Sequence, residues 1–207
     1  MTRVKVCGIT SLEDALAALD AGAHMLGFNF YARSPRYITP AEARKVVEQL
    51  PEGVSCVGVF VNEPAPAEVE RIARAAGLGA VQLHGDETPE FCRSLGGLTT
   101  IKALRVGADY TPESAARYQT DAVLLDAYVA GARGGTGHTF DWTLATLTRE
   151  RVPRLFLAGG LNPDNVASAV AAVRPYAVDV CSGVETSPGR KSPELMRRFV
   201  KAVDSRQ

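Results

Sequence analysis

The chain has 207 residues, with 23 lysine and arginine side chains against 23 aspartate and glutamate side chains, so its formal net charge is zero. This balance gives no indication of a nucleic acid, an anionic membrane or an acidic tail as a partner. The length is enough for a large buried core, so we expect a single domain over residues 1–207.

The cysteines and histidines indicate neither a metal site nor a disulfide framework. Four cysteines lie far apart without a C-x-x-C pair, and three histidines show no ligand spacing. The first strand-like run begins within a few residues of Met1, and no apolar run approaches membrane-spanning length. We therefore expect a cytoplasmic protein with free thiols and no membrane contact.

Eight short β-branched or apolar runs alternate with amphipathic segments along the whole chain. These predicted strands lie near 3–8, 25–30, 55–61, 80–84, 99–106, 122–128, 154–160 and 177–183. Strict alternation implies parallel strands joined by right-handed crossovers. Eight such units in this length favour a closed (βα)8 TIM barrel, with an open doubly wound sheet as the alternative.

The predicted helices share one kind of start, a capping side chain followed by proline at the first helical position. The pairs are Thr39-Pro40, Thr88-Pro89, Thr111-Pro112, Asn162-Pro163 and Ser192-Pro193. The first helix has Thr10 or Ser11 as its cap instead. A short helix is also expected after the eighth strand, with Ser182 or Gly183 at its cap.

In a barrel of this kind the active site lies at the carboxyl ends of the strands, and Cys7 ends the first one. Side chains alternate along a strand, so Lys5 and Cys7 share one face while Val4 and Val6 take the other. An ammonium below the thiol would favour the thiolate and make Cys7 a usable base. Packing as a small hydrophobe is the alternative, and the residues alone leave both open.

Polar side chains near other strand ends are further candidates. His84 ends the fourth strand, and Asp126 ends an apolar run, where burial would raise its pKa toward that of a general acid. A hydrogen-bonded structural aspartate is the alternative for Asp126. Asp179 shares its strand face with Cys181 and either orients a substrate or holds the barrel interior together.

Glycine-rich stretches at 134–137, 158–161 and 181–185 follow late strands. Backbone N–H groups there can approach an anion closely, and the loops after the seventh and eighth strands form the recurrent phosphate site of these barrels. After the second strand, Arg36 lies between Pro35 and Tyr37 in a loop above the same mouth. It is a candidate for a bidentate contact with a carboxylate.

The chain resembles the phosphoribosylanthranilate isomerase family over essentially its whole length. The matching segments, in order, are "VKVCGIT", "LGFNFYARSPRYI", "VGVFVN", "VQLHGDE", "LLDA", "GGTGHTFDW", "LAGGLNPDNV" and "VDVCSGVETSPGRKSPELM". The family's usual form of the last segment begins "VDVSSGVE", so Cys181 replaces its first serine. The resemblance implies a cofactor-free Amadori rearrangement of a phosphorylated small molecule in tryptophan biosynthesis, by a monomer or a homodimer.

The resemblance also implies residue roles. Asp126 would be the general acid that opens the furanose ring, Cys7 the general base that removes the C2′ proton, and Arg36 the partner of the anthranilate carboxylate. We count His84 and Asp179 as further substrate-binding residues. The phosphate would be cradled by backbone groups around Gly135, Gly159, Gly160, Ser182 and Gly183.

Two other functions compete with this one. A Schiff-base aldolase would use Lys5 or Lys102 as its nucleophile, because a buried lysine can have a depressed pKa. A catalytically silent barrel, which serves ligand binding or subunit interaction, would bind a ligand in the pocket without converting it.

Overall fold

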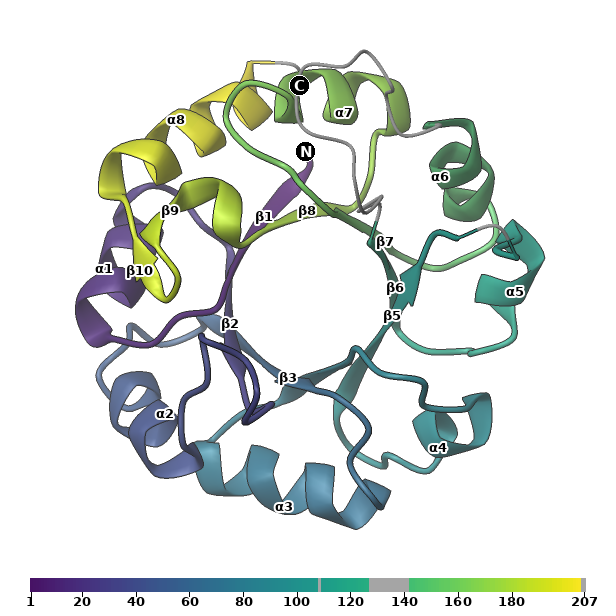
Figure 1. Cartoon of the computed structure of the whole chain (residues 1–207), viewed down its shortest axis with the longest axis horizontal. Coiled ribbons are helices and arrows are strands. Elements are labelled where there is room, and N and C mark those ends of the chain that lie inside the picture. The colour runs from purple at the N-terminus through teal and green to yellow at the C-terminus, as the bar shows by residue number, and fades with distance from the viewer. Residues whose placement is uncertain (108, 127–141, 206–207) are drawn as a thin grey trace.

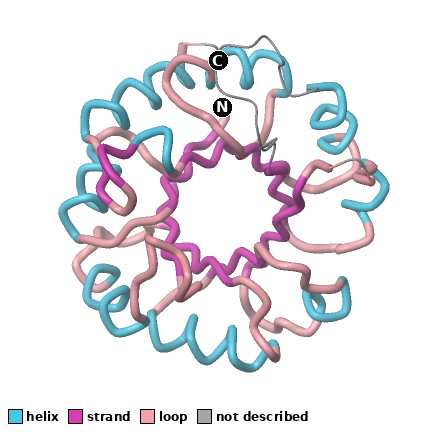
Figure 2. The backbone as a smooth tube through the Cα atoms, in the orientation of Figure 1, coloured by secondary structure: helices cyan, strands magenta, loops and turns pink. Residues whose placement is uncertain are grey.

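The computed structural model describes residues 1–107, 109–126 and 142–205. Eight parallel strands close into one barrel in chain order, and the helices form a ring around it (Figures 1 and 2). The strands are β1 Arg3–Cys7, β2 Met25–Asn29, β3 Ser55–Phe60, β4 Ala80–Leu83, β5 Thr99–Arg105, β6 Ala122–Asp126, β7 Leu155–Ala158 and β8 Ala177–Val180. The (βα)8 barrel predicted from the sequence is confirmed, and the open sheet is excluded.

The outer ring contains one helix after each strand. These are α1 Leu12–Asp20, α2 Pro40–Val47, α3 Pro66–Ala76, α4 Pro89–Arg93, α5 Pro112–Ala116, α6 Trp142–Arg149, α7 Val166–Val173 and α8 Pro193–Asp204. Between β8 and α8 the chain forms a 3₁₀ turn, η1 Ser182–Val184, and a two-stranded hairpin of β9 Glu185–Ser187 and β10 Arg190–Lys191.

Strand alternation divides the core into two layers. Val4 and Val6 of β1 belong to the layer between strands and helices, whereas Lys5 points into the barrel and bonds to groups on β4 and β8. Small and apolar residues such as Met25, Val57 and Leu124 fill the barrel interior. The predicted split of β1 into two faces is therefore confirmed.

Four of the five predicted cap-proline pairs begin a helix. Thr39, Thr88, Thr111 and Ser192 each accept a hydrogen bond from the backbone amide three residues further on, and Ser11 caps α1 in the same way. Proline at the first position removes an N–H group that would have had no partner within the helix.

The helix start predicted at Asn162-Pro163 is wrong, because α7 begins at Val166. The side-chain oxygen of Asn162 accepts from the amide of Asp164 at 2.8 Å, and its carbonyl accepts from Val166 at 3.1 Å. The asparagine thus closes a turn of its own ahead of the helix.

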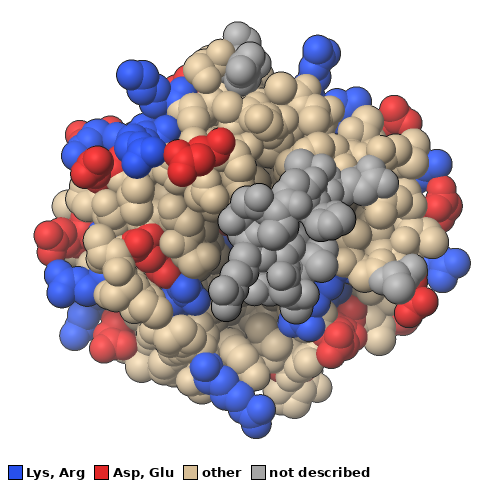
Figure 3. Space-filling model, turned by 45° about the horizontal axis from the view of Figure 1, so that its top comes forward, with Lys and Arg blue, Asp and Glu red and all other residues tan. Residues whose placement is uncertain are grey.

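The short helix after β8 is present, but Cys181 occupies its cap position rather than Ser182 or Gly183. None of the helices in the described ranges is long and apolar enough to cross a membrane. On the face shown in Figure 3, basic and acidic side chains are interspersed.

Candidate active site

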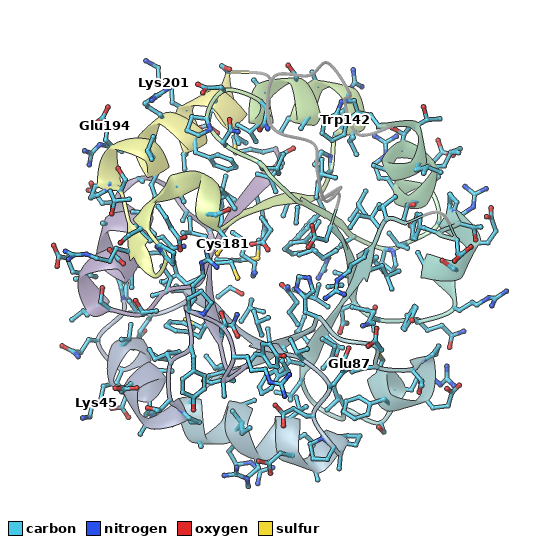
Figure 4. All side chains as sticks on the ribbon, viewed as in Figure 1. Lys45, Glu87, Trp142, Cys181, Glu194 and Lys201 are labelled. Carbon is cyan, nitrogen blue, oxygen red and sulfur yellow. The ribbon has the colours of Figure 1, made fainter. Side chains whose placement is uncertain are left out.

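The carboxyl ends of the strands surround a cavity of about 260 Å³. Its lining includes eight residues predicted from the sequence: Cys7, Arg36, His84, Asp126, Gly159, Gly160, Asp179 and Ser182. Figure 4 shows Cys181, which also lines the cavity, at the inner rim of the strand ring, whereas Lys45, Glu194 and Lys201 lie on the outer helices. Residues from seven of the eight barrel strands and their loops thus meet at one site.

Cys7 is a buried thiol that the surroundings make acidic. A hydrogen bond with Cys181 holds the pKa of Cys7 well below its ordinary value, although burial opposes this. The positive charges of Lys5 and Lys191 lower it further. Lys5 lowers the pKa of Cys7, as expected from the sequence, but the hydrogen bond with Cys181 has the larger effect.

Lys5 and Asp179 form a buried ion pair below the thiol, with Nζ and Oδ1 2.9 Å apart. Burial alone would lower the pKa of Lys5, but Asp179 and Cys7 raise it above its ordinary value. Burial raises the pKa of Asp179 to about 7 in spite of Lys5. Asp179 is therefore ion-paired inside the barrel and also lines the cavity, and its role toward a substrate stays a prediction.

Asp126 reaches the cavity from the end of β6 and stays partly accessible. Its Oδ2 lies 3.3 Å from His84 Nε2, and both side chains are 24% exposed. The predicted burial of Asp126 is thus only partial. His84 thus contacts the carboxylate that the family resemblance assigns as the general acid. The sequence did not predict this contact.

Arg36 projects into the cavity from the loop after β2 while it is fixed by Glu185. Its Nε and Nη2 donate to the two oxygens of that carboxylate at 2.8 and 2.7 Å. Lys191 binds the same carboxylate at 2.8 Å. Burial alone would raise the pKa of Glu185, but the hydrogen bonds from Arg36 and Lys191 lower it. The guanidinium is therefore held in one orientation.

The glycine-rich loops after β7 and β8 meet at the cavity edge. Gly159 and Gly160 have positive φ angles of 93° and 66°, which glycine adopts without strain. Gly183 packs against the Leu161 carbonyl so closely that a Cβ would collide with it, and it does not itself line the cavity. Gly135, the remaining predicted phosphate contact, lies outside the described residues.

Three site residues were missed from the sequence: Gln82, Glu185 and Lys191. Gln82 is a polar residue inside an apolar strand, two positions before His84, so strand parity could have placed both on the inner face. Glu185 and Lys191 gave no comparable signal, because the β9–β10 hairpin that brings them together has no apolar pattern. Among the described residues, no group of three or more His, Cys, Asp or Glu could hold a metal ion.

A closed (βα)8 barrel with titratable groups gathered at the carboxyl ends of its strands defines an enzyme of the α/β-barrel class. Residues 4–202 match the sequence model of the N-(5'phosphoribosyl)anthranilate (PRA) isomerase family. The chain belongs to this family.

Individual relatives are similar over nearly the whole chain. The N-(5'-phosphoribosyl)anthranilate isomerase of Trichlorobacter lovleyi is 51% identical over 201 residues, which are 97% of each protein. The crystal structure of phosphoribosyl anthranilate isomerase from Thermotoga maritima superposes with a TM-score of 0.91 at 47% identity, over 99% of this chain and 100% of that one. The crystal structure of a phosphoribosyl anthranilate isomerase in complex with reduced 1-(o-carboxyphenylamino)-1-deoxyribulose 5-phosphate superposes with a TM-score of 0.88. Its sequence is 45% identical, and the match covers 99% of this chain and 100% of that one.

Proposed function

We propose that this chain isomerises N-(5′-phosphoribosyl)anthranilate to 1-(2-carboxyphenylamino)-1-deoxyribulose 5-phosphate in tryptophan biosynthesis, with Cys7 as the general base and Asp126 as the general acid. The observation that carries the proposal is the placement of an acidic thiol and a carboxylate on one cavity of a chain in this family. The Amadori rearrangement needs one acid and one base and no redox step.

In the first step the carboxyl group of Asp126 protonates the furanose ring oxygen. The C1′–O bond breaks, the anthranilate nitrogen supplies its electron pair, and a Schiff base forms. His84, 3.3 Å from Asp126, steadies the carboxylate that remains.

In the second step the thiolate of Cys7 removes the proton from C2′. The electron pair moves to the Schiff-base nitrogen and gives an enolamine, which tautomerises to the ketone. The depressed pKa of Cys7 supports this role, because a thiol with its ordinary pKa of about 8.5 is mostly protonated at neutral pH.

Both ends of the substrate have candidate partners at the cavity. Arg36 faces it with a fixed guanidinium, which suits the anthranilate carboxylate. Within the described residues, no group accepts a hydrogen bond from the backbone amides of Gly160 or Ser182, which both line the cavity, so these N–H groups can bind the phosphate. Asp179 lines the same cavity and is a further candidate for substrate binding. Holding both ends makes the two proton transfers intramolecular.

The Schiff-base aldolase alternative fits the lysines poorly. Lys5 is ion-paired with Asp179, and its pKa is raised rather than depressed. Lys102 donates to the carbonyls of Leu83 and Gly85 and to Glu87 at 2.7 Å, so its amine is held as a buried structural ammonium. An unprotonated amine is needed for attack on a carbonyl.

The proposal is tested by following the fluorescence of phosphoribosylanthranilate, generated in situ, in the presence of the chain. We expect rapid loss of the substrate signal, and no covalent lysine adduct when borohydride is added with a keto sugar phosphate. Binding of a reduced product analogue without turnover would indicate the silent binding barrel, and a trapped lysine adduct the aldolase.

We propose that residues 1–207 act as one catalytic domain in the cytoplasm. All four cysteines are free, which suits a reducing compartment.

A further inference from the structure

A chain of polar side chains crosses the barrel mouth from Lys5 to Asp126. Lys5 Nζ lies 3.0 Å from Gln82 Oε1, Gln82 Nε2 lies 2.9 Å from His84 Nδ1, and His84 Nε2 lies 3.3 Å from Asp126 Oδ2. Gln82 is only 1% exposed. It lies on the inner face of β4, and His84, two positions later and just past the end of the strand, has the same side-chain parity.

The hydrogen bond between Lys5 and Gln82 determines which atoms donate and which accept in the other two hydrogen bonds. An ammonium has only hydrogens to offer, so Gln82 must turn its oxygen to Lys5. The amide NH₂ then faces His84 Nδ1, which therefore accepts, and the ring proton lies on Nε2 toward Asp126. A flipped amide would set two donors against each other at 3.0 Å. Asp179 keeps Lys5 charged and so keeps this orientation in place.

We propose that Gln82 is a positioning residue, which holds His84 as a neutral imidazole with its proton on Nε2, so that Asp126 faces a neutral donor. The inference rests on the proposed role of Asp126 as the acid. An imidazolium at the same place would favour the ionised carboxylate, so less of Asp126 would carry the proton that it must donate. Gln82 prevents this because Nδ1 cannot carry a proton while the amide donates to it.

Several charged groups surround the His84 ring from the neighbouring strands. Asp126 on β6 and Asp179 on β8 share the active-site cavity with it. Lys102 and Arg105 on β5, together with Asp86, line an adjoining cavity that His84 also borders. Lys102 is neutralised by Glu87 at 2.7 Å. Of all these groups, the amide of Gln82 is the one within hydrogen-bond distance of Nδ1, at 2.9 Å.

The direct test is ¹⁵N NMR of the protein labelled at histidine, which distinguishes protonated from unprotonated ring nitrogens. The chain has three histidines, and His84→Asn assigns the signal. We expect His84 to be unprotonated at Nδ1 and protonated at Nε2 at neutral pH. In Gln82→Glu, which offers Nδ1 an acceptor, we expect both nitrogens to be protonated.

His24 is an internal control, because its Nδ1 accepts from the backbone amide of Val4 at 3.2 Å. Its signals should be the same in both proteins. A wild-type His84 that is protonated at Nδ1 would overturn the inference. This readout does not involve turnover, so it stands even if the proposed isomerase activity fails.

The pH dependence of kcat/KM tests whether the protonation state of His84 affects the proposed general acid. We expect Gln82→Glu to move the high-pH limb of kcat/KM to lower pH by about one unit or more. Gln82→Met, which keeps the length of the side chain but makes no hydrogen bond, should lower kcat without that displacement. If Gln82 had only a structural role, both variants would lose folded enzyme and the high-pH limb of their kcat/KM profiles would not move. A folded Gln82→Glu enzyme whose high-pH limb does not move would contradict the inference.

Discussion

Cys7 is acidic because of side chains that lie far from it in the sequence. Cys181 caps η1 after β8 and Lys191 lies in the β9–β10 hairpin, and only Lys5 is close in sequence, two positions before Cys7. Position at the end of a strand made Cys7 and Asp126 predictable as candidates. Gln82 was not predictable as a working residue, because its role depends on Lys5, 77 positions away.

The depressed pKa of Cys7 predicts its reactivity. Its thiolate should persist as the pH falls below the ordinary thiol value of about 8.5, so the rate of alkylation by iodoacetamide should stay nearly constant down to neutral pH. Burial raises the pKa of Cys56 and Cys92 to about 11, and both should remain unmodified. Mass spectrometry locates the adducts, and a rate that falls tenfold per unit from pH 8.5 to 7.5 would contradict this prediction.

Arg36 and Glu185 should affect substrate binding more than chemistry. Arg36→Met removes the guanidinium that we assign to the anthranilate carboxylate, so KM should rise by about tenfold or more, as expected for a charged hydrogen bond. Glu185→Gln keeps the guanidinium but weakens its ion pair with residue 185, and also that of Lys191, so its KM should rise less. Steady-state kinetics measure both, and an unchanged KM in Arg36→Met would remove Arg36 from carboxylate recognition.

At the scale of elements, the loops after β7 and β8 form one unit at the cavity edge. Gly183 in η1 packs directly against the Leu161 carbonyl, a contact that no side chain fits. The sequence predicted glycine-rich anion loops here but not this contact, because close approach between two loops leaves no periodic signal. The cap at Cys181 was missed for a related reason, since its side chain makes no capping hydrogen bond.

Gly183→Ala should therefore push the two loops apart and weaken phosphate binding. We expect a rise in KM and in the inhibition constant of inorganic phosphate of about tenfold, with a smaller change in kcat. Gly189→Ala is a control in the neighbouring hairpin: it strains a positive φ of 83° without this backbone clash. Equal effects of the two variants on phosphate inhibition would contradict the account.

At the scale of the molecule, the barrel was predictable because alternation and capping are local properties of the chain. The buried ion pairs were not, because two of them join residues from opposite ends of the chain, on neighbouring strands or loops that the fold brings together. Lys5 reaches Asp179 across 174 positions, and Glu185 holds Arg36 across 149. Lys102, which the sequence left open as a nucleophile, bonds to Glu87 inside the barrel wall.

Lys102→Met should lower the free energy of unfolding by about 3–5 kcal/mol, because it leaves the Glu87 carboxylate buried without its cation. The double variant Lys102→Met/Glu87→Gln should recover part of this loss. Urea denaturation measures both. An aldolase nucleophile would behave differently: Lys102→Met would abolish activity while the protein stayed stable.

The most direct test of the central claim compares kcat for phosphoribosylanthranilate between the wild type and Cys7→Ser, with Asp126→Asn alongside. The account predicts that each variant loses about 10²–10⁴ in kcat, the usual contribution of a positioned acid or base. Each should bind the reduced product analogue almost as tightly as the wild type. A folded Cys7→Ser enzyme with near wild-type turnover would show that Cys7 is not the base and would contradict the account.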